Sequence, residues 1–206
     1  MPRSRPDHII VTAASLQEGV DYVRLELGVA PQTGGEHVHM GTHNCLLKLG
    51  DNIYLEVIAA NPAAPHPDRP RWFQLDEPES VKAPRLAAWV ARCDYIHALA
   101  PASLGKIETL ARGSFRWLIT IPEDGKLPLQ GLAPSLIEWR SETHPAQGLK
   151  DSGCSLVRFE GFHPQPEKVT SVLRSIGFDG EFAVSRSETP HLVAHIQTPA
   201  GPRLLR

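Results

Sequence analysis

The feature that most constrains the fold of this chain is an internal repeat of about 80 residues. In the first copy an apolar strand precedes a helix and at least two more strands, and a second copy with the same order begins near residue 86. Glu56 lies in the last strand of the first copy, and Glu138 lies in the last strand of the second, 82 positions later. Such self-similarity predicts two modules of similar structure within one chain.

The helix of the first copy has the clearest boundaries. Ser15 and Glu18 form a capping box, an apolar stripe follows at helical spacing, and Gly28 ends the pattern. The turn Gly50-Asp51-Asn52 joins two of the strands that follow. The remaining elements of the two copies are predicted as a short helix at 94–105 and strands at 7–13, 34–40, 42–50, 52–60, 86–92, 106–114, 115–123 and 135–140.

Prolines mark the border between the two copies. Six of them fall between residues 62 and 84, too many for regular structure throughout, which predicts an ordered linker. After the second copy, an apolar helical stripe at 164–178 lies between strand-like runs. We therefore expect a first module at 1–60, the linker at 61–85, a second module at 86–150, and a shorter C-terminal unit at 151–206 packed on the same domain.

Composition argues against several classes of partner. The 206 residues are 41% hydrophobic and 21% charged, as in ordinary globular proteins, and the formal net charge is −2. This near-neutral charge does not indicate nucleic-acid binding, and no apolar run reaches the ~18 residues of a membrane span. The first residues lack the apolar region of a secretory signal, and the three cysteines form no CxxC pair. We expect a cytoplasmic protein without nucleic-acid or membrane partners.

Several motifs resemble the vicinal oxygen chelate superfamily, and within it the glyoxalase-like domain proteins. They are DHIIV at the start, ELGV after the first helix, GTHN through YLEVIA, RPRWFQLD in the linker, and SLIEW with the following THP. The resemblance implies an α+β fold of paired βαβββ modules, whose curled mixed sheets surround a cavity, here with a shorter C-terminal βαββ unit. It also implies a divalent metal ion in the cavity, as in well-studied members.

Strand alternation suggests which side chains would hold that metal. Tyr54, Glu56 and Ile58 share one face of their strand, and His8 shares a face with Ile10 and Thr12. If the helices cover the opposite faces, then His8, Glu56 and Glu138 point into the cavity. One imidazole and two carboxylates can hold Zn, Ni, Fe, Mn or Co with open positions, and one of the glutamates could then act as a base.

The resemblance implies four ligands, and the position expected to supply another is Ala88, which cannot bind a metal. His43 and Asn44 of GTHN are candidates for a replacement ligand or for substrate binding, and their alternation leaves open which of them faces the cavity. The alternative interpretation of His8 is a hydrogen-bonded core histidine. For Glu56 and Glu138 the alternative is a buried ion pair with an arginine.

Three arginines form a second candidate group. Arg92, Arg116 and Arg140 are predicted to share the face of Glu138, and arginine forks suit carboxylate or phosphate ligands. The competing interpretation is that they meet solvent at strand ends or neutralise Glu138. Three tryptophans fall in the opposite phase and are predicted to pack against helices; they are Trp89, Trp117 and Trp139. The pair His37 and His39 is predicted to lie in a loop.

Two classes of function follow from these residues. The favoured class is a metal-dependent enzyme of lyase, isomerase or dioxygenase type that acts on a small oxygenated metabolite. The alternative is a non-catalytic protein that binds or sequesters a small molecule, with a degenerate metal site and the same residues as a polar floor. The two modules can close around the cavity within one chain or across a homodimer.

Overall fold

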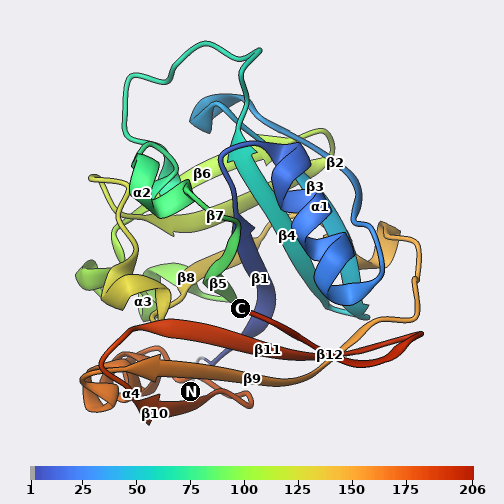
Figure 1. The fold of residues 1–206 in the computed structure, drawn as a ribbon. Coiled ribbons are helices and arrows are strands. Elements are labelled where there is room, and N and C mark those ends of the chain that lie inside the picture. Colours follow the sequence, from blue (N-terminus) through green and yellow to red (C-terminus); the bar gives the residue numbers. More distant parts are fainter. Residues whose placement is uncertain (1–2) are drawn as a thin grey trace.

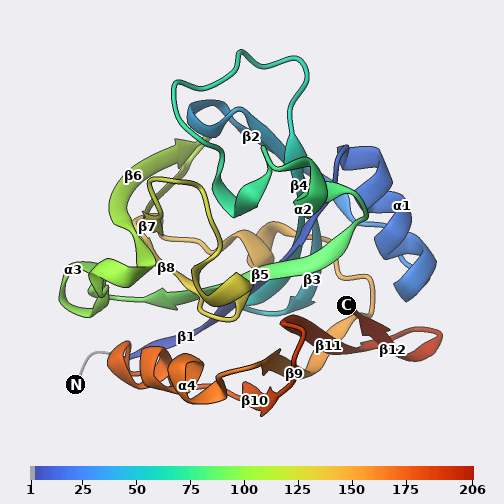
Figure 2. The ribbon, with the colours of Figure 1, turned by 60° about the vertical axis from the view of Figure 1, so that its left-hand side comes forward.

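The computed structural model describes residues 3–206 (Figure 1). Its larger part is an eight-stranded sheet with the order β2-β3-β4-β1-β5-β8-β7-β6, which curls around its own inner face (Figure 2). The strands of this sheet are β1 (Ser4–Thr12), β2 (Gln32–His37), β3 (Thr42–Gly50), β4 (Ile53–Ala60), β5 (Arg85–Cys93), β6 (Lys106–Arg112), β7 (Phe115–Ile121) and β8 (Ser135–Trp139). The predicted fold class, a curled α+β sheet of paired modules, is confirmed.

Each half of the sheet is one copy of the sequence repeat. In the first half β1 pairs in parallel with β4, and in the second half β5 pairs in parallel with β8. The halves join through antiparallel pairing of β1 with β5, in which Ile9 lies opposite Trp89 and Ile10 lies opposite Ala88. The pairing is therefore symmetric about Ile9 and Trp89, as expected for a duplicated unit.

The helices of the two halves differ in length. Helix α1 (Leu16–Leu27) begins as predicted, because the Ser15 side chain accepts a hydrogen bond from the Glu18 backbone N–H, and Gly28 ends it in the left-handed conformation. Its buried side chains Val23 and Leu27 belong to the same apolar cluster as Leu55 and Val57 of β4. Between β5 and β6, the place that corresponds to α1, the second half has the short α3 (Ile96–Leu99) and a 3₁₀ turn at Ala102–Leu104.

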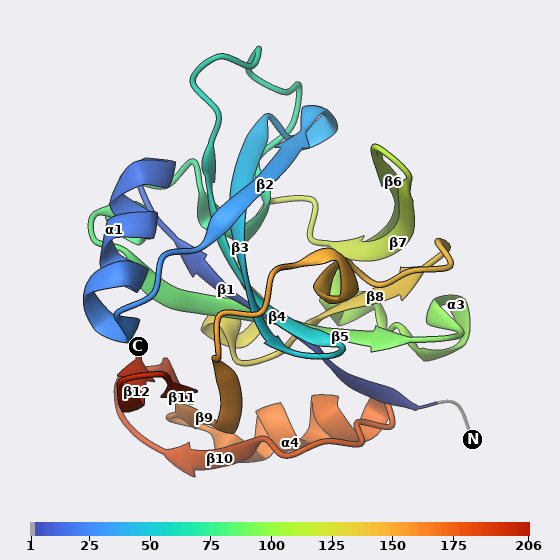
Figure 3. The same cartoon turned by 90° about the vertical axis from the view of Figure 1, so that its right-hand side faces the viewer.

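The C-terminal unit forms a second sheet beneath the first (Figure 3). It consists of β9 (Ser155–His163), α4 (Pro166–Ser175), β10 (Ala183–Arg186), β11 (His191–Thr198) and β12 (Gly201–Leu205). Its order is β10-β9-β11-β12, so its first strand lies inside the sheet rather than at the edge of its own module. The unit therefore has one strand more than predicted and a strand order different from that of the two repeats.

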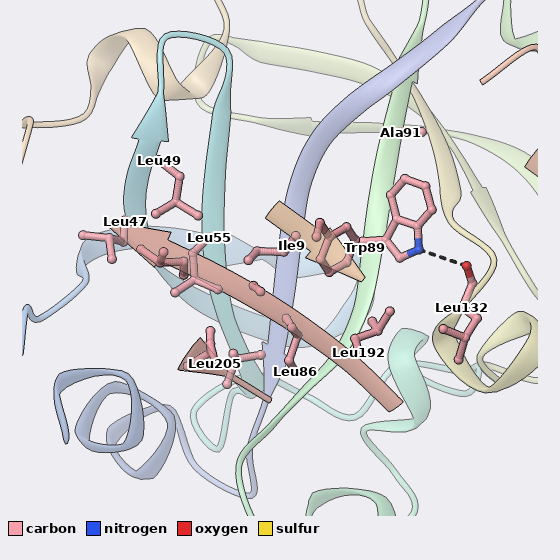
Figure 4. Close-up of a cluster of buried hydrophobic side chains, with 14 of the residues drawn as sticks. Ile9, Leu47, Leu49, Leu55, Leu86, Trp89, Ala91, Leu132, Leu192 and Leu205 are labelled. Carbon is pink, nitrogen blue, oxygen red and sulfur yellow. Dashed lines mark hydrogen bonds between the residues drawn. The ribbon is translucent and has the colours of Figure 1, made fainter. Parts of the chain in front are cut away.

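The main core fills the space between the two sheets (Figure 4). Trp89 of β5 packs against Phe159 and Phe182 of the C-terminal unit, and its indole N–H donates to the backbone oxygen of Leu132 at 3.0 Å. Trp89 is thus a core packing residue, as predicted, but its aromatic partners belong to the C-terminal unit and not to a helix. Because the outer face of the first sheet is buried in this way, its inner face is left for a cavity.

The proline-rich linker crosses from β4 to β5 and contributes to that inner face (Figure 2). It contains a 3₁₀ turn at Trp72–Gln74 and the short helix α2 (Pro78–Val81). Phe73 and Gln74 have positive φ angles of 57° and 56°, a conformation that is costly for residues other than glycine. The Arg69–Glu108 ion pair connects the linker to β6.

Among residues 3–206, none of the helices has the length and apolar character required to cross a membrane.

Candidate functional site

A small cavity lies inside the curl of the first sheet and has a volume of about 30 Å³. This is room for roughly two water molecules. Seven strands and the linker supply its lining, which consists of His8, His37, Asn44, Tyr54, Glu56, Trp72, Phe73, Arg112, Trp117, Ile119, Ile137 and Trp139.

The polar floor of the cavity is a chain of three titratable side chains. Asp7 Oδ1 lies 2.6 Å from His8 Nδ1, and His8 Nε2 lies 3.4 Å from Glu56 Oε2. The other oxygen of Asp7 lies 3.0 Å from His144 Nε2 and accepts a hydrogen bond from the indole N–H of Trp139, also at 3.0 Å. Asp7 is completely buried, and its carboxylate holds His8 in one orientation with Nε2 directed at Glu56.

Electrostatic interactions keep Asp7, His8 and Glu56 charged at neutral pH. Burial alone lowers the pKa of His8, but its hydrogen bonds to Asp7 and Glu56 outweigh burial and raise that pKa to about 9. Burial likewise opposes ionisation of Glu56, yet the hydrogen bond and charge of His8 hold its pKa at about 2. The same balance, with contributions from both His144 and His8, keeps the pKa of Asp7 well below its usual value. The floor is therefore an imidazolium between two carboxylates.

Asn44 connects this floor to a cationic wall. Its side-chain N–H donates to Glu56 Oε1 at 2.5 Å, and its side-chain oxygen accepts from Arg112 at 3.0 Å. Arg112 Nη1 also lies 3.3 Å from His37 Nε2. Burial lowers the pKa of His37 to about 4, so this imidazole is neutral beside the guanidinium. The open choice within GTHN is thus resolved: Asn44 faces the cavity, whereas His43 shares the face of Cys45 and Leu47 and is absent from the lining.

Aromatic side chains form the remaining walls. Tyr54 stacks on His8 with a centroid separation of 4.5 Å, and Trp117 and Trp139 lie 5.5 Å apart. Trp72 of the linker meets His37 edge-on at 5.1 Å. The prediction that Trp117 and Trp139 pack against helices is wrong, because both line the cavity. The expectation of a loop at His37 is also wrong, since this residue ends β2 and is buried.

The predicted orientation of Glu138 is wrong. Its carboxylate accepts a hydrogen bond from the Ile96 backbone N–H at the start of α3 (2.8 Å) and pairs with Arg140 at 2.9 Å. Ile137 and Trp139, its neighbours on β8, are the residues that face the cavity. Glu138 therefore stabilises the helix side of the sheet and does not meet His8 or Glu56.

A shift in the repeat explains this error. In the first half, Glu56 of β4 lies opposite Ile10 of β1. The counterpart of Ile10 on β5 is Val90. The β8 residue that lies opposite Val90 is Ser135. Ser135 is thus the structural counterpart of Glu56, three positions before Glu138. Because strand side chains alternate between faces, a displacement by an odd number of residues sends a side chain to the opposite face. The counterpart of His8 is Ala88, as the sequence comparison indicated.

The three predicted arginines do not meet at the cavity. Arg92 donates to the backbone oxygen of Asn52, and Arg116 donates to backbone oxygens of Gly113 and Phe115 at the β6–β7 turn. Arg140 pairs with Glu138 and is half exposed. The predicted grouping of these arginines around a ligand is wrong, and Arg112 is the arginine that lines the cavity.

The site also contains residues that were not predicted from the sequence to have a role in it: Asp7, His37, Tyr54, Arg112 and His144. Asp7 was not predicted to belong to the site, because the pairing of β1 with β5 shifts register between Pro6 and His8. Such a bulge interrupts strict alternation, so that Asp7 and His8 approach each other. His144 carried a signal, because it belongs to the THP motif of the resemblance.

The floor of the cavity supplies too few donors for a divalent metal ion. His8 Nε2 and Glu56 Oε2 lie side by side, and the Asp7–His8 hydrogen bond is the support that metal-bound histidines commonly have. The symmetry-related positions Ala88 and Ser135 supply no imidazole or carboxylate, and Glu138 lies on the other face. Within residues 3–206 no group of three or more His, Cys, Asp and Glu side chains could hold a metal ion. Two donors fall short of the three or four that such sites use.

Comparisons with known proteins place this geometry in context. A family model described as "Glyoxalase-like domain" matches residues 7–177. A hypothetical protein from Staphylococcus aureus has a similar structure, with a TM-score of 0.60 and 12% identity over 91% of this chain and 88% of that chain. The Mn(II)-bound glyoxalase from Novosphingobium aromaticivorans has a TM-score of 0.52 and 8% identity over 99% of this chain and 81% of that chain.

A methylmalonyl-CoA epimerase from Mycobacterium tuberculosis is more distant, with a TM-score of 0.40 and 14% identity over 65% of this chain and 85% of that chain. No curated protein sequence matches significantly. At these identities the structural likeness describes the fold alone.

Proposed function

The chain belongs to the glyoxalase-like domain family of the vicinal oxygen chelate superfamily, and from this premise we propose that it is an enzyme that moves a proton within a small oxygenated metabolite. The observation that carries the proposal is the buried network of the side chains of Asp7, His8 and Glu56 at the floor of an aromatic cavity. Clustered titratable groups with perturbed pKa values in a concave site are characteristic of catalytic machinery.

His8 and Glu56 have complementary roles in the proposed reaction. With its pKa near 9, the His8 imidazolium carries a proton on Nε2 that a substrate carbonyl oxygen can accept in place of Glu56. Glu56 then loses the partner that lowers its pKa, so its carboxylate becomes a stronger base for a proton on the adjacent carbon. Asp7 keeps His8 oriented and stabilises its positive charge throughout.

The sequence favours a metal-dependent enzyme. Of the metal ligands expected from the sequence, only His8 and Glu56 meet among the described residues. The proposed reaction therefore routes no step through a metal. We expect its rate to survive treatment with EDTA followed by buffer exchange. Loss of activity on this treatment, restored by one equivalent of Zn²⁺ or Mn²⁺, would assign the chemistry to a bound ion.

Hydrogen exchange tests the proposal directly. The protein is incubated in D₂O with the hemithioacetal of methylglyoxal and glutathione, and separately with pyruvate, and C–H loss is followed by ¹H NMR. We expect exchange above the buffer rate, reduced about 10²- to 10⁴-fold in Glu56→Gln. Glu138→Gln is the matched control, because it makes the same change in the other repeat and on the opposite face. Equal rates in the two variants would refute the role of Glu56.

The second candidate is a pocket that binds a small molecule without converting it. Its support is that each Glu56 oxygen already has a partner, Asn44 for one and His8 for the other. Under this alternative a ligand raises the unfolding temperature of the protein, while neither the hemithioacetal nor pyruvate undergoes hydrogen exchange or any other conversion.

A further inference from the structure

We propose that the small molecule bound in this cavity carries a carboxylate group that is recognised by Arg112, with the indole N–H of Trp72 as a second donor. The inference rests on the proposed function in that it concerns the same cavity, and it names the class of substrate: a short 2-oxo or 2-hydroxy carboxylate. It moves the recognition of anions from the three strand-end arginines to a residue on β6.

The charge of Arg112 is not compensated by a neighbouring carboxylate of the described residues. Within residues 3–206 no carboxylate lies within 4.0 Å of its guanidinium, whereas Arg69, Arg71 and Arg140 near the same sheet each pair with one. The hydrogen bonds of Arg112 in this part of the chain involve Nη1 alone, which meets Asn44 and His37. A guanidinium has five N–H donors in a planar fork that suits a carboxylate, so donors remain for a ligand.

Trp72, which lines the same cavity as Arg112, has an unsatisfied hydrogen-bond donor. Trp72 is 5% exposed, and its indole N–H has no acceptor among the described residues. Its ring lies edge-on to His37, the imidazole that Arg112 contacts. A buried N–H without a partner is unfavourable, and buried tryptophans usually find an acceptor. A ligand oxygen in the cavity would supply one.

The distribution of charge gives the ligand a direction. One end of the polar network holds the carboxylates of Asp7 and Glu56 around the His8 imidazolium, while Arg112, beside the neutral His37, gives the other end a positive charge. The amide of Asn44 alone separates Glu56 from Arg112. A substrate that spans them has its carboxylate one or two bonds from the carbon that loses the proton, which is C2 in a 2-hydroxy acid and C3 in a 2-oxo acid.

Entry of such a ligand requires more room than about 30 Å³. Trp72 and Phe73 border this cavity and also a second one of about 10 Å³ lined by Thr120 and Ser135. Displacement of these two aromatic side chains would join the two spaces. Phe73 and Gln74 have left-handed backbone conformations, which are costly for residues other than glycine.

Calorimetric titration with pyruvate and lactate tests the inference, with lactamide as the uncharged analogue. We expect the acids to bind and lactamide to bind about 10- to 100-fold more weakly, because the amide lacks the charge that Arg112 recognises. Arg112→Gln should weaken binding of the acids by a similar factor, and Trp72→Phe should weaken it by less. Arg116→Gln is the matched control, since Arg116 lies at a turn outside the lining.

Equal affinity for lactate and lactamide, or unchanged affinity in Arg112→Gln, would overturn the inference. The comparison of acid with amide uses the unaltered protein, so it remains decisive even if the Arg112 variant does not fold. Failure of the proposed function has a different signature: the acids bind through Arg112, but no hydrogen exchange follows. Exchange on the hemithioacetal of methylglyoxal and 2-mercaptoethanol, which carries no carboxylate, together with no binding of any small acid, would retain the function and remove the carboxylate.

Discussion

The charged floor of the cavity makes the stability of this protein depend on pH in a specific way. The pKa of His8 is about 9 in the folded protein, whereas a histidine without these partners, as in the unfolded chain, has a pKa of 6.5. A group whose pKa is raised by folding stabilises the protein fully below the lower value, and the contribution disappears as pH rises through the higher value. The free energy of unfolding should therefore fall between pH 6.5 and pH 9.

The size of the effect follows from the same two values. At about 1.4 kcal/mol for each unit of pKa difference, the contribution of His8 below pH 6.5 is about 3 kcal/mol. Roughly 2 kcal/mol of it should be lost by pH 8. His37, whose pKa of about 4 lies below 6.5, acts on the acid side, where stability falls as pH drops from 6.5 toward 4. The window from pH 6.5 to 9 thus isolates His8 from His37.

Urea denaturation at several pH values between 6.5 and 9 measures this change. The test variant is His8→Gln, in which the pH-dependent decline should be largely absent, whatever the absolute stability of the variant. His191→Gln is the matched control, because this histidine is exposed and lies outside the cavity. A decline of the same steepness in His8→Gln and in the unaltered protein would refute the assignment of the raised pKa to His8.

Three further predictions concern stability. Glu56→Gln should reduce the loss of stability between pH 4.5 and pH 2, because a carboxylate with a lowered pKa stabilises above 4.5 and loses that effect toward 2; acid titration followed by circular dichroism measures it. Glu138→Ala should cost about 1–3 kcal/mol in urea denaturation while hydrogen exchange persists, since the Ile96 N–H loses its acceptor. Gly131→Ala should cost about 3 kcal/mol or more, because its Cβ would lie 1.9 Å from a backbone oxygen, whereas Gly148→Ala meets no atom within 4 Å and should change stability by about 0.5 kcal/mol or less.

The sequence predicted the fold well because the fold depends on patterns that are local or repeated. The capping box at Ser15 and the glycine stop at Gly28 involve neighbouring residues, and both are present in the structure. The apolar alternation of β1 and β4 brought His8 and Glu56 to the same face, where they lie 3.4 Å apart. The C-terminal unit was harder, because its strand order depends on pairing between distant segments.

The second half of the site was predicted poorly for a reason of register. Alignment of the repeats matched Glu56 with Glu138 by residue type, but strand pairing matches Glu56 with Ser135. A period of two means that an odd displacement reverses every assignment along a strand, which is why Trp117 and Trp139 were misplaced together with Glu138. The bulge before His8 had the same effect on Asp7; it falls at Pro6, a residue type that cannot donate to the strand ladder.

The symmetry of the β1–β5 pairing has a consequence for protein engineering. Ala88 and Ser135 occupy the positions that correspond to His8 and Glu56, and both side chains are small and buried. The substitutions Ala88→His and Ser135→Glu would give each half of the molecule the same imidazole and carboxylate. Two changes of residue would then separate the natural chain from a symmetric scaffold with four donors, in which the contribution of a metal to catalysis could be added and removed at will.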